Sequence, residues 1–277
     1  MNRKQAKGVT SRTLRMKQRI INSAKLRTNR LSWLFILGVN NSGTTLLEDL
    51  LGRHAGIAKL PGEGQRLTRA LFSPVRLKVR RLWTEKVESF RRFPGRGDAL
   101  LTARVKWDWL GLYPVGGRTR FLMEKSPPNS VRGPWLQHHF KPASFVALTR
   151  SPFAVAEGIR RREGHSIERA ARHWTVANRI MIDDLDRLDR HLLLSYEDLC
   201  ADPSRQMDRV TRFLGIDSYE DEWLDGTFSI HNAKERPSSI INFNEASHEA
   251  LSSDDIRRIE DIAGDVMNRL GYDSITG

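Results

Sequence analysis

The amino-acid sequence predicts an α/β fold in which a central parallel sheet is flanked by helices on both faces. From residue 32 onward, short apolar runs of strand length alternate with longer segments whose apolar residues recur every three or four positions. This alternation is typical of strand–helix–strand units. The 277 residues are 39% apolar and include a further 20 glycines, which is enough for one sizeable core. We therefore expect a single domain over residues 31–277, preceded by an arm over residues 1–30.

The expected elements follow from these runs in chain order. The expected strands are residues 33–39, 121–124, 144–148 and 191–195. The expected helices are residues 44–53, 75–92, 153–161, 167–188, 203–214 and 254–270. The last helix has the clearest boundaries, because Ser253 can cap it, Asp254 and Asp255 suit its positive end, and Gly271 ends it.

The sequence predicts neither a membrane span nor a disulfide. The longest apolar stretch, residues 31–39, is well short of the roughly 20 residues that cross a bilayer. The basic N-terminus lacks the apolar core and cleavage site of a secretory signal. Cys200 is the single cysteine, so no internal disulfide can form, which is typical of a reducing compartment. We expect a soluble, cytoplasmic protein.

The formal net charge of +13 is concentrated in two blocks. Residues 1–30 hold ten Lys or Arg and no acid, residues 66–96 hold ten against two acids, and the rest of the chain sums to −5. Because the charge is local, we expect no nucleic-acid partner. We interpret residues 1–30 as a flexible basic arm or an amphipathic helix. This segment is either a solvated tail or, as the functional alternative, makes a peripheral contact with an anionic membrane or a polyanion. The basic face of the expected helix 75–92 is either solvated or suited to an acidic acceptor.

The segment after the first expected strand has the composition of a phosphate-binding loop. Gly38 and Gly43 bracket four residues between an apolar strand and a helix, so backbone N–H groups can surround an anion at the helix N-terminus. Thr44 and Thr45 add hydroxyl donors. Nucleotide hydrolases need Lys directly after the second glycine, where this chain has Thr44. The loop therefore predicts a P-loop-type domain but argues against ATP or GTP hydrolysis, and a turn with chance glycines is the structural alternative.

Four segments of the sequence share one pattern with a known family. They are residues 42–47 (Ser-Gly-Thr-Thr-Leu-Leu), 124–129 (Glu-Lys-Ser-Pro-Pro-Asn), 147–152 (Ala-Leu-Thr-Arg-Ser-Pro) and 196–199 (Tyr-Glu-Asp-Leu). In this order, over about residues 33–272, the chain resembles bacterial sulfotransferases with similarity to tyrosylprotein and carbohydrate sulfotransferases. The resemblance implies 3′-phosphoadenylyl sulfate (PAPS) as sulfuryl donor, adenosine 3′,5′-bisphosphate (PAP) as product, and a sulfotransferase domain over residues 31–277. The acceptor would be a hydroxyl or an amine.

The same resemblance implies a set of donor-binding residues. The 5′ end of the donor would lie on Asn41, Ser42, Gly43, Thr44, Thr45 and Leu46. The 3′-phosphate would contact Arg150, Gly158 and Arg162, and the remaining contacts would come from Tyr196, Arg236, Ser238 and Ser239. Two of these positions depart from the family. Gly158 stands where serine is usual, so a backbone N–H or Ser151 must substitute, and Asn41 stands where Lys or Arg usually stabilises the leaving oxygen.

Lys125 is the implied electrostatic catalyst. It follows an expected strand end, where α/β sites lie, and it matches a lysine that approaches the sulfuryl group in some relatives. A surface ion pair with Glu124 is the alternative role. Because a sulfuryl group has less charge than a phosphoryl group, no metal is required, and the dispersed histidines form no metal-ligand cluster in the sequence.

Glu63 is the implied general base. Its Pro-Gly-Glu-Gly segment resembles that of relatives with a glutamate base, although a shifted alignment would put Gly64 at that position. His54 and Asp108 are reserve bases. A base must come within hydrogen-bond reach of the proton that it takes, directly or through one water.

Two other function classes stay open at this point. A P-loop kinase or NTPase would use Glu124 or Asp198 to order magnesium, but it would lack the loop lysine. A non-enzymatic binder of polyanions or anionic membranes would depend on the two basic blocks. For a sulfotransferase, the basic block 66–96 favours an acidic glycan or glycolipid as acceptor, while small molecules and peptides remain open.

Overall fold

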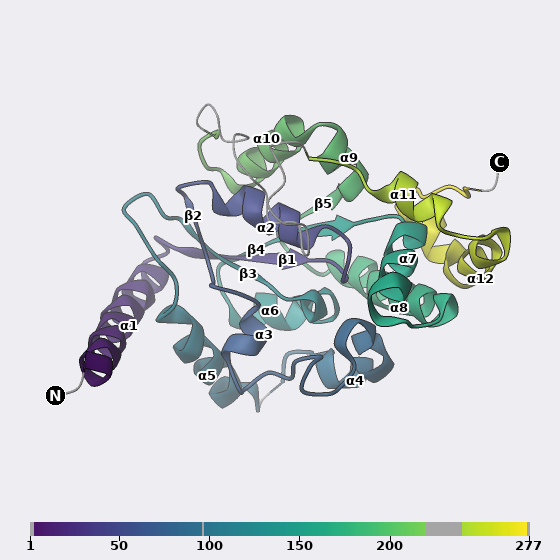
Figure 1. The fold of residues 1–277 in the computed structure, drawn as a ribbon. Helices are drawn as coiled ribbons and strands as arrows, with labels where there is room; N and C mark the ends of the chain where they lie inside the picture. Colours follow the sequence, from purple (N-terminus) through teal and green to yellow (C-terminus); the bar gives the residue numbers. More distant parts are fainter. Residues whose placement is uncertain (1–2, 96, 220–239, 276–277) are drawn as a thin grey trace.

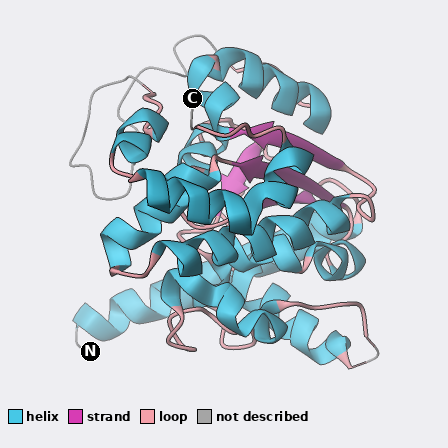
Figure 2. Cartoon of the chain, turned by 90° about the vertical axis from the view of Figure 1, so that its right-hand side faces the viewer, coloured by secondary structure: helices cyan, strands magenta, loops and turns pink. Residues whose placement is uncertain are grey.

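The computed structural model describes residues 3–95, 97–219 and 240–275. At its centre is a five-stranded sheet whose strands are all parallel and follow the order β2-β3-β1-β4-β5 (Figure 1). The strands are β1 (Ser32–Leu37), β2 (Ile57–Lys59), β3 (Phe121–Lys125), β4 (Ala143–Thr149) and β5 (His191–Ser195). Helices surround this sheet (Figure 2), so the predicted fold class is confirmed.

The helices extend over much of the described chain. They are α1 (Arg3–Arg27), α2 (Thr44–Gly52), α3 (Gly64–Leu67), α4 (Val87–Phe90), α5 (Asp98–Leu110), α6 (Gly133–His139), α7 (Pro152–Glu163), α8 (Ile167–Leu185), α9 (Tyr196–Ala201), α10 (Pro203–Leu214), α11 (Asn244–Glu249) and α12 (Ser253–Leu270), with the 3-10 helices η1 (Arg80–Lys86) and η2 (Pro127–Val131). The expected strands and five of the six expected helices are present to within about three residues. The cap of α12 is Ser252 rather than Ser253, because Ser252 and Asp255 form a reciprocal capping box.

Strand β1 contributes to two of the three apolar clusters that the described residues form in the core. Its odd-numbered residues, among them Trp33 and Phe35, pack in a cluster with α5 and α6. Its even-numbered residues, Leu34 and Ile36, pack in a second cluster with α2, α9 and α10. Side chains alternate between the faces of a strand, so a strand that is apolar throughout must be covered on both sides.

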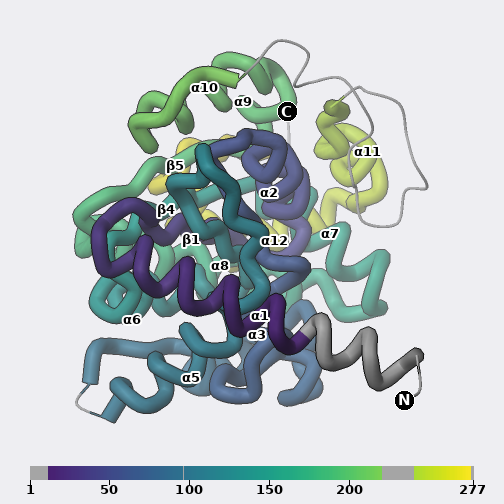
Figure 3. Tube along the Cα trace, turned by 90° about the vertical axis from the view of Figure 1, so that its left-hand side faces the viewer, coloured from purple at the N-terminus to yellow at the C-terminus, as the bar shows by residue number. Residues whose placement is uncertain are grey.

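Helix α1 packs on α5 through part of its C-terminal half and runs along the outside of the domain (Figure 3). The buried Asn22 donates from Nδ2 to the Leu110 carbonyl over 2.8 Å, and Arg19 donates from Nε to the Trp107 carbonyl over 2.7 Å. Leu14 and Ile20 remain more than 60% exposed. Within the described residues, no helix is both long enough and apolar enough to cross a membrane.

The prediction of one continuous helix over residues 75–92 is wrong. Lys78 and Arg80 have φ angles of 58° and 26°, and Leu82 also leaves the helical region, so the segment forms η1 and α4 instead. The spacing of apolar residues is helical, but residues within the segment make separate tertiary contacts. The indole of the buried Trp83 donates to Asn40 Oδ1, and the Thr84 hydroxyl bonds His173 Nδ1. These contacts outweigh the local periodicity.

The sheet order determines where a ligand can bind. After β1 the chain continues to β2 at one end of the sheet, and after β4 it continues to β5 at the other end, although β1 and β4 are neighbours. Such a switch point leaves a crevice outside the carboxyl ends of the two strands.

Candidate active site

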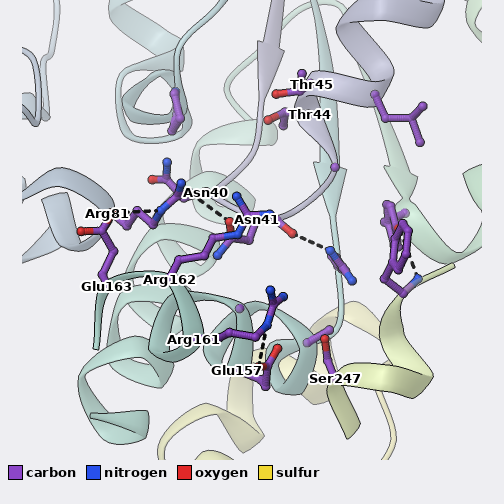
Figure 4. A pocket seen from close by; sticks show the side chains of 18 of the residues that line it. Asn40, Asn41, Thr44, Thr45, Arg81, Glu157, Arg161, Arg162, Glu163 and Ser247 are labelled. Atoms are coloured by element: carbon purple, nitrogen blue, oxygen red, sulfur yellow. Dashed lines mark hydrogen bonds and ion pairs between the residues drawn. The ribbon is translucent and has the colours of Figure 1, made fainter. Parts of the chain in front are cut away.

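A cavity of about 660 Å³ lies at this switch point. Its walls come from the loop after β1, the carboxyl end of β3, the residue after β4 and helix α7 (Figure 4). Most of the donor and catalytic residues expected from the sequence line it: Asn41, Gly43, Thr44, Thr45, Leu46, Glu63, Lys125, Arg150, Gly158, Arg162 and Tyr196. Ser42 is not among the lining residues. Arg236, Ser238 and Ser239 fall outside the described residues.

The loop over residues 38–45, here called the phosphate loop, has a backbone that only certain residues tolerate. Gly43 has φ 89°, and a Cβ there would lie 2.4 Å from Tyr196 Cδ2, so no side chain fits. The buried Ser42 hydroxyl donates to the Val39 carbonyl over 2.7 Å, which stabilises the turn from inside. Helix α2 then begins at Thr44, and among the described residues no side chain caps it. Its first N–H groups are therefore available to an anion.

Arg150 is fixed against the phosphate loop. Its Nη1 donates to the Asn41 carbonyl over 2.9 Å, its Nε donates to Asn244 Oδ1 over 2.8 Å, and its guanidinium carbon lies 4.1 Å from the centre of the Tyr196 ring. Burial lowers the pKa of Arg150, and the nearby Tyr196 and Glu197 act in the opposite direction. Such a desolvated guanidinium favours an anion as its remaining partner.

The two residues that depart from the sulfotransferase pattern, Asn41 and Gly158, are neighbours in space. A Cβ at Gly158 would lie 3.2 Å from Asn41 Nδ2, so the glycine makes room for the amide. Arg162 lies one turn further along α7 and also lines the cavity. Its pKa is lowered first by burial and then by repulsion from Arg81, Arg161 and Arg150.

Lys125 is buried at the end of β3 between two carboxylates. Its Nζ lies 3.3 Å from Glu48 Oε2, 4.0 Å from Glu63 Oε1 and 3.5 Å from the Thr45 hydroxyl. Burial raises the pKa of Glu48, and Lys125 opposes that rise. The alternative pair with Glu124 is not formed, because the Glu124 carboxylate accepts hydrogen bonds from the Gly64 N–H, Ser126 and Asn129.

Glu63 immediately precedes α3, with its carboxylate in the cavity wall. Its Oε2 accepts from Gln65 Nε2 over 2.9 Å and lies 3.1 Å from Arg66 Nε. Gly64 leaves no room for a side chain, since its Cβ would lie 2.6 Å from the Trp109 ring.

The two reserve bases lie elsewhere. His54 Nε2 bonds the Asp217 carbonyl, and Asp108 Oδ2 accepts from Thr68 and Arg104. Neither lines the cavity.

Sequence reasoning missed several charged residues that line the cavity or contact its residues. Arg81 donates from Nη1 to Asn41 Oδ1 over 3.0 Å, and Arg161 pairs with Glu157 in the same wall (Figure 4). Glu48 lies on α2, four residues after Thr44, and no sequence motif marks that position. Arg81 belongs to the basic block 66–96, so the sequence did signal its charge but not its place in the site. Within the described ranges, no three His, Cys, Asp or Glu side chains form a group that could hold a metal ion.

The sequence of the chain is similar to known sulfotransferases. A model of the sulfotransferase family matches residues 34–221. Over 272 residues the chain is 24% identical to protein-tyrosine sulfotransferase A of Caenorhabditis elegans, covering 88% of this chain and 68% of that protein.

Two solved structures have the same fold. One is the sulfotransferase domain from the Synechococcus PCC 7002 olefin synthase, with TM-score 0.53, 23% identity and coverage of 88% of this chain and 96% of that one. The other is the sulfotransferase domain from the curacin biosynthetic pathway, with TM-score 0.52, 20% identity and coverage of 88% and 98%. The family model covers well over half of the sequence. The chain belongs to the sulfotransferase family.

Proposed function

We propose that this sulfotransferase moves the sulfuryl group of PAPS to a hydroxyl or amine of its acceptor. One observation supports this donor: a single cavity is lined by the phosphate loop, Arg150, Lys125 and Glu63. A cavity of about 660 Å³ is also within the range of roughly 300–1,000 Å³ that small-molecule and cofactor sites occupy.

The donor would bind with its two charged ends on different elements. The phosphosulfate end suits the phosphate loop, where the uncapped N-terminus of α2 and the hydroxyls of Thr44 and Thr45 offer donors. The 3′-phosphate suits Arg150 and Arg162. Arg150 is already oriented by Asn41 and Asn244, so little side-chain freedom is lost when an anion binds.

Lys125 and Glu63 would share the chemistry. Lys125 lies against Thr45 of the phosphate loop, where a positive charge can stabilise the transferring sulfuryl group. The Glu63 carboxylate lies 4.0 Å from Lys125, so an acceptor beside this pair, within hydrogen-bond reach of both, would meet a cation and a proton acceptor. Lys125, Glu63 and the phosphate loop therefore lie close enough to hold an acceptor and the sulfuryl group in line for transfer, and such positioning is itself a source of catalysis.

For the acceptor, the cavity wall favours an acidic molecule. Arg66, Arg80 and Arg161 line the cavity in addition to the arginines assigned to the donor. We keep an acidic glycan or glycolipid as the expected class. A tyrosyl hydroxyl of an acidic protein is the second candidate, because the relative from Caenorhabditis elegans is named a protein-tyrosine sulfotransferase.

We also propose that α1 holds the enzyme at an anionic lipid surface. The helix combines exposed aliphatic residues with basic side chains and has no acidic residue in its sequence. Amphipathic basic helices of this kind bind anionic membranes peripherally.

The catalytic roles are tested with ³⁵S-labelled PAPS and fractionated extracts as the acceptor source. We expect Glu63→Gln to reduce transfer by about 10²–10⁴-fold while leaving PAP affinity within about threefold of wild type, because a base acts in the transition state. Asp108→Asn is the matched control, since Asp108 lies outside the cavity. If Asp108→Asn abolished transfer while Glu63→Gln retained it, Glu63 would not be the base.

A further inference from the structure

The phosphate loop has no positive charge of its own, yet a guanidinium group lies against it. Residues 38–45 read Gly-Val-Asn-Asn-Ser-Gly-Thr-Thr. Arg81, 40 positions away in the chain, donates from Nη1 to Asn41 Oδ1 over 3.0 Å. Figure 4 shows Arg81 beside Asn41 in the cavity wall. Asn41 lies where sulfotransferases usually have a basic residue, so a cation is present at this place although the loop sequence lacks one.

Three contacts fix the position of Arg81. The neighbouring Trp83 is fully buried and donates from Nε1 to Asn40 Oδ1 over 2.9 Å, so η1 is bonded to two consecutive loop residues. Arg81 Nε also lies 3.3 Å from Glu163 at the end of α7. Only 21% of the Arg81 side chain is exposed. These contacts hold the Arg81 side chain in a defined position between η1 and the phosphate loop, so it is not a freely moving surface side chain.

The break in the expected helix 75–92 is what allows this contact. Leu82 has non-helical φ and ψ angles of −102° and 40°, between the two residues that bond the loop. In a regular helix, residues 81 and 83 would point about 200° apart, so both could not face Asn40 and Asn41. The irregular backbone places both side chains on the same loop.

The charges around Arg81 leave a place for an anion. Arg81, Arg150 and Arg162 line the same cavity, where Arg81 also pairs with the Glu163 carboxylate. The mutual repulsion of these arginines contributes, after burial, to the lowered pKa of Arg162. A negatively charged ligand between them would relieve that repulsion.

We propose that Arg81 supplies, from outside the phosphate loop, the positive charge that stabilises the leaving oxygen. This inference rests on the proposed function. In the transfer, the acceptor oxygen or nitrogen forms a bond to sulfur, and the bond between sulfur and the bridging oxygen of PAPS breaks. The acceptor's proton goes to the Glu63 carboxylate, and the electron pair of the broken bond stays on the phosphate of PAP. Arg81 then faces the oxygen on which this negative charge develops, while Lys125 acts at the other end of the loop.

The test uses Arg81→Gln, which removes the charge but keeps a side-chain N–H donor for Asn41. Lys86→Ala is the matched control, because it removes one positive charge from the same 3-10 helix, where Lys86 donates to the Leu77 carbonyl and does not line the cavity. The third variant combines Arg81→Gln with Asn41→Lys, which returns a cation to the loop itself. Transfer from labelled PAPS, PAP affinity by calorimetry and thermal unfolding are measured for all of them.

We expect Arg81→Gln to lower turnover by about 10²–10³-fold, with PAP affinity reduced less than tenfold. We expect Lys86→Ala to match wild type, and the double variant to recover at least tenfold of the lost turnover. Wild-type turnover in Arg81→Gln would overturn the inference. It would also be overturned if affinity and turnover fell equally without rescue by Asn41→Lys, since Arg81 would then only bind the nucleotide or support the fold. A wild-type chain that neither binds PAP nor transfers sulfate would instead refute the proposed function.

Discussion

At the scale of single residues, Asn41 illustrates what a sequence motif leaves out. Its φ of 65° is in the left-handed region, which asparagine tolerates better than most residues. Its amide packs beside Gly158 and accepts from Arg81. Read singly, positions 41 and 158 are two unexplained departures from the family pattern. Because Asn41 and Gly158 contact each other, we interpret the two departures as a single coupled change in the site, in which the glycine makes room for the asparagine side chain. Only the tertiary structure could reveal this contact.

His173 gives a residue-scale prediction about stability. It is fully buried, its Nδ1 bonds the Thr84 hydroxyl, and burial lowers its pKa to about 3. Between that value and the ordinary pKa of about 6.5, the unfolded chain binds a proton that the folded chain does not, so stability falls as the pH falls through this range. From pH 6.5 to pH 4.5, this one group contributes a loss of about 2–3 kcal/mol.

Urea unfolding at pH 6.5 and pH 4.5 measures this loss, with His173→Gln as the comparison. The variant should be less stable at pH 6.5, because it disturbs a packed site, but its stability should fall less between the two pH values. An equal fall in both proteins would mean that His173 is accessible to protons in the folded state.

At the scale of secondary structure, long periodic segments are predictable from the sequence and short ones are not. The three residues of β2 and the four of α3 are too few to display a period, so neither was expected. Helix α5 was missed because Leu100 and Trp107 are exposed and obscure its apolar stripe. The segment around η1 was misassigned for the opposite reason, since its apolar spacing is helical while its backbone follows contacts with the phosphate loop and α8.

Helix α1 gives the element-scale prediction. Ile20 and Ile21 are 63% and 48% exposed, and the C-terminal half of the helix also presents Lys17, Lys25 and Arg27. We expect flotation with vesicles that contain phosphatidylglycerol and none with pure phosphatidylcholine. Replacing both isoleucines by serine should weaken binding at least tenfold, because each buried aliphatic side chain contributes about 1.5–3 kcal/mol.

Phe72→Ser is the control for this experiment, since Phe72 is 46% exposed on another segment. Vesicle binding that is unchanged in the double serine variant would show that α1 is not the lipid contact. Binding of equal strength to neutral vesicles would contradict the electrostatic part of the proposal.

At the scale of the whole molecule, strand order brings the site together. The sequence predicted most strands and the loop after β1, but neighbouring strands in this sheet come from distant parts of the chain, and strand pairing is not visible in local patterns. The expectation that the phosphate loop and Arg150 share one crevice depended on β1 lying beside β4, and the structure has this pair. Arg81 could not be expected, because η1 reaches the loop through an irregular backbone.

The most direct test of a nucleotide site at this crevice is calorimetric titration of the intact chain with PAP. We expect wild type to bind one equivalent, and Arg150→Ala to bind about 10–100-fold more weakly, because it loses a charge-assisted contact with the 3′-phosphate. Arg169→Ala should bind as wild type does, since Arg169 pairs with Glu85 at the surface outside the cavity. Failure of the wild-type chain to bind PAP, or equal affinity in Arg150→Ala, would contradict the account.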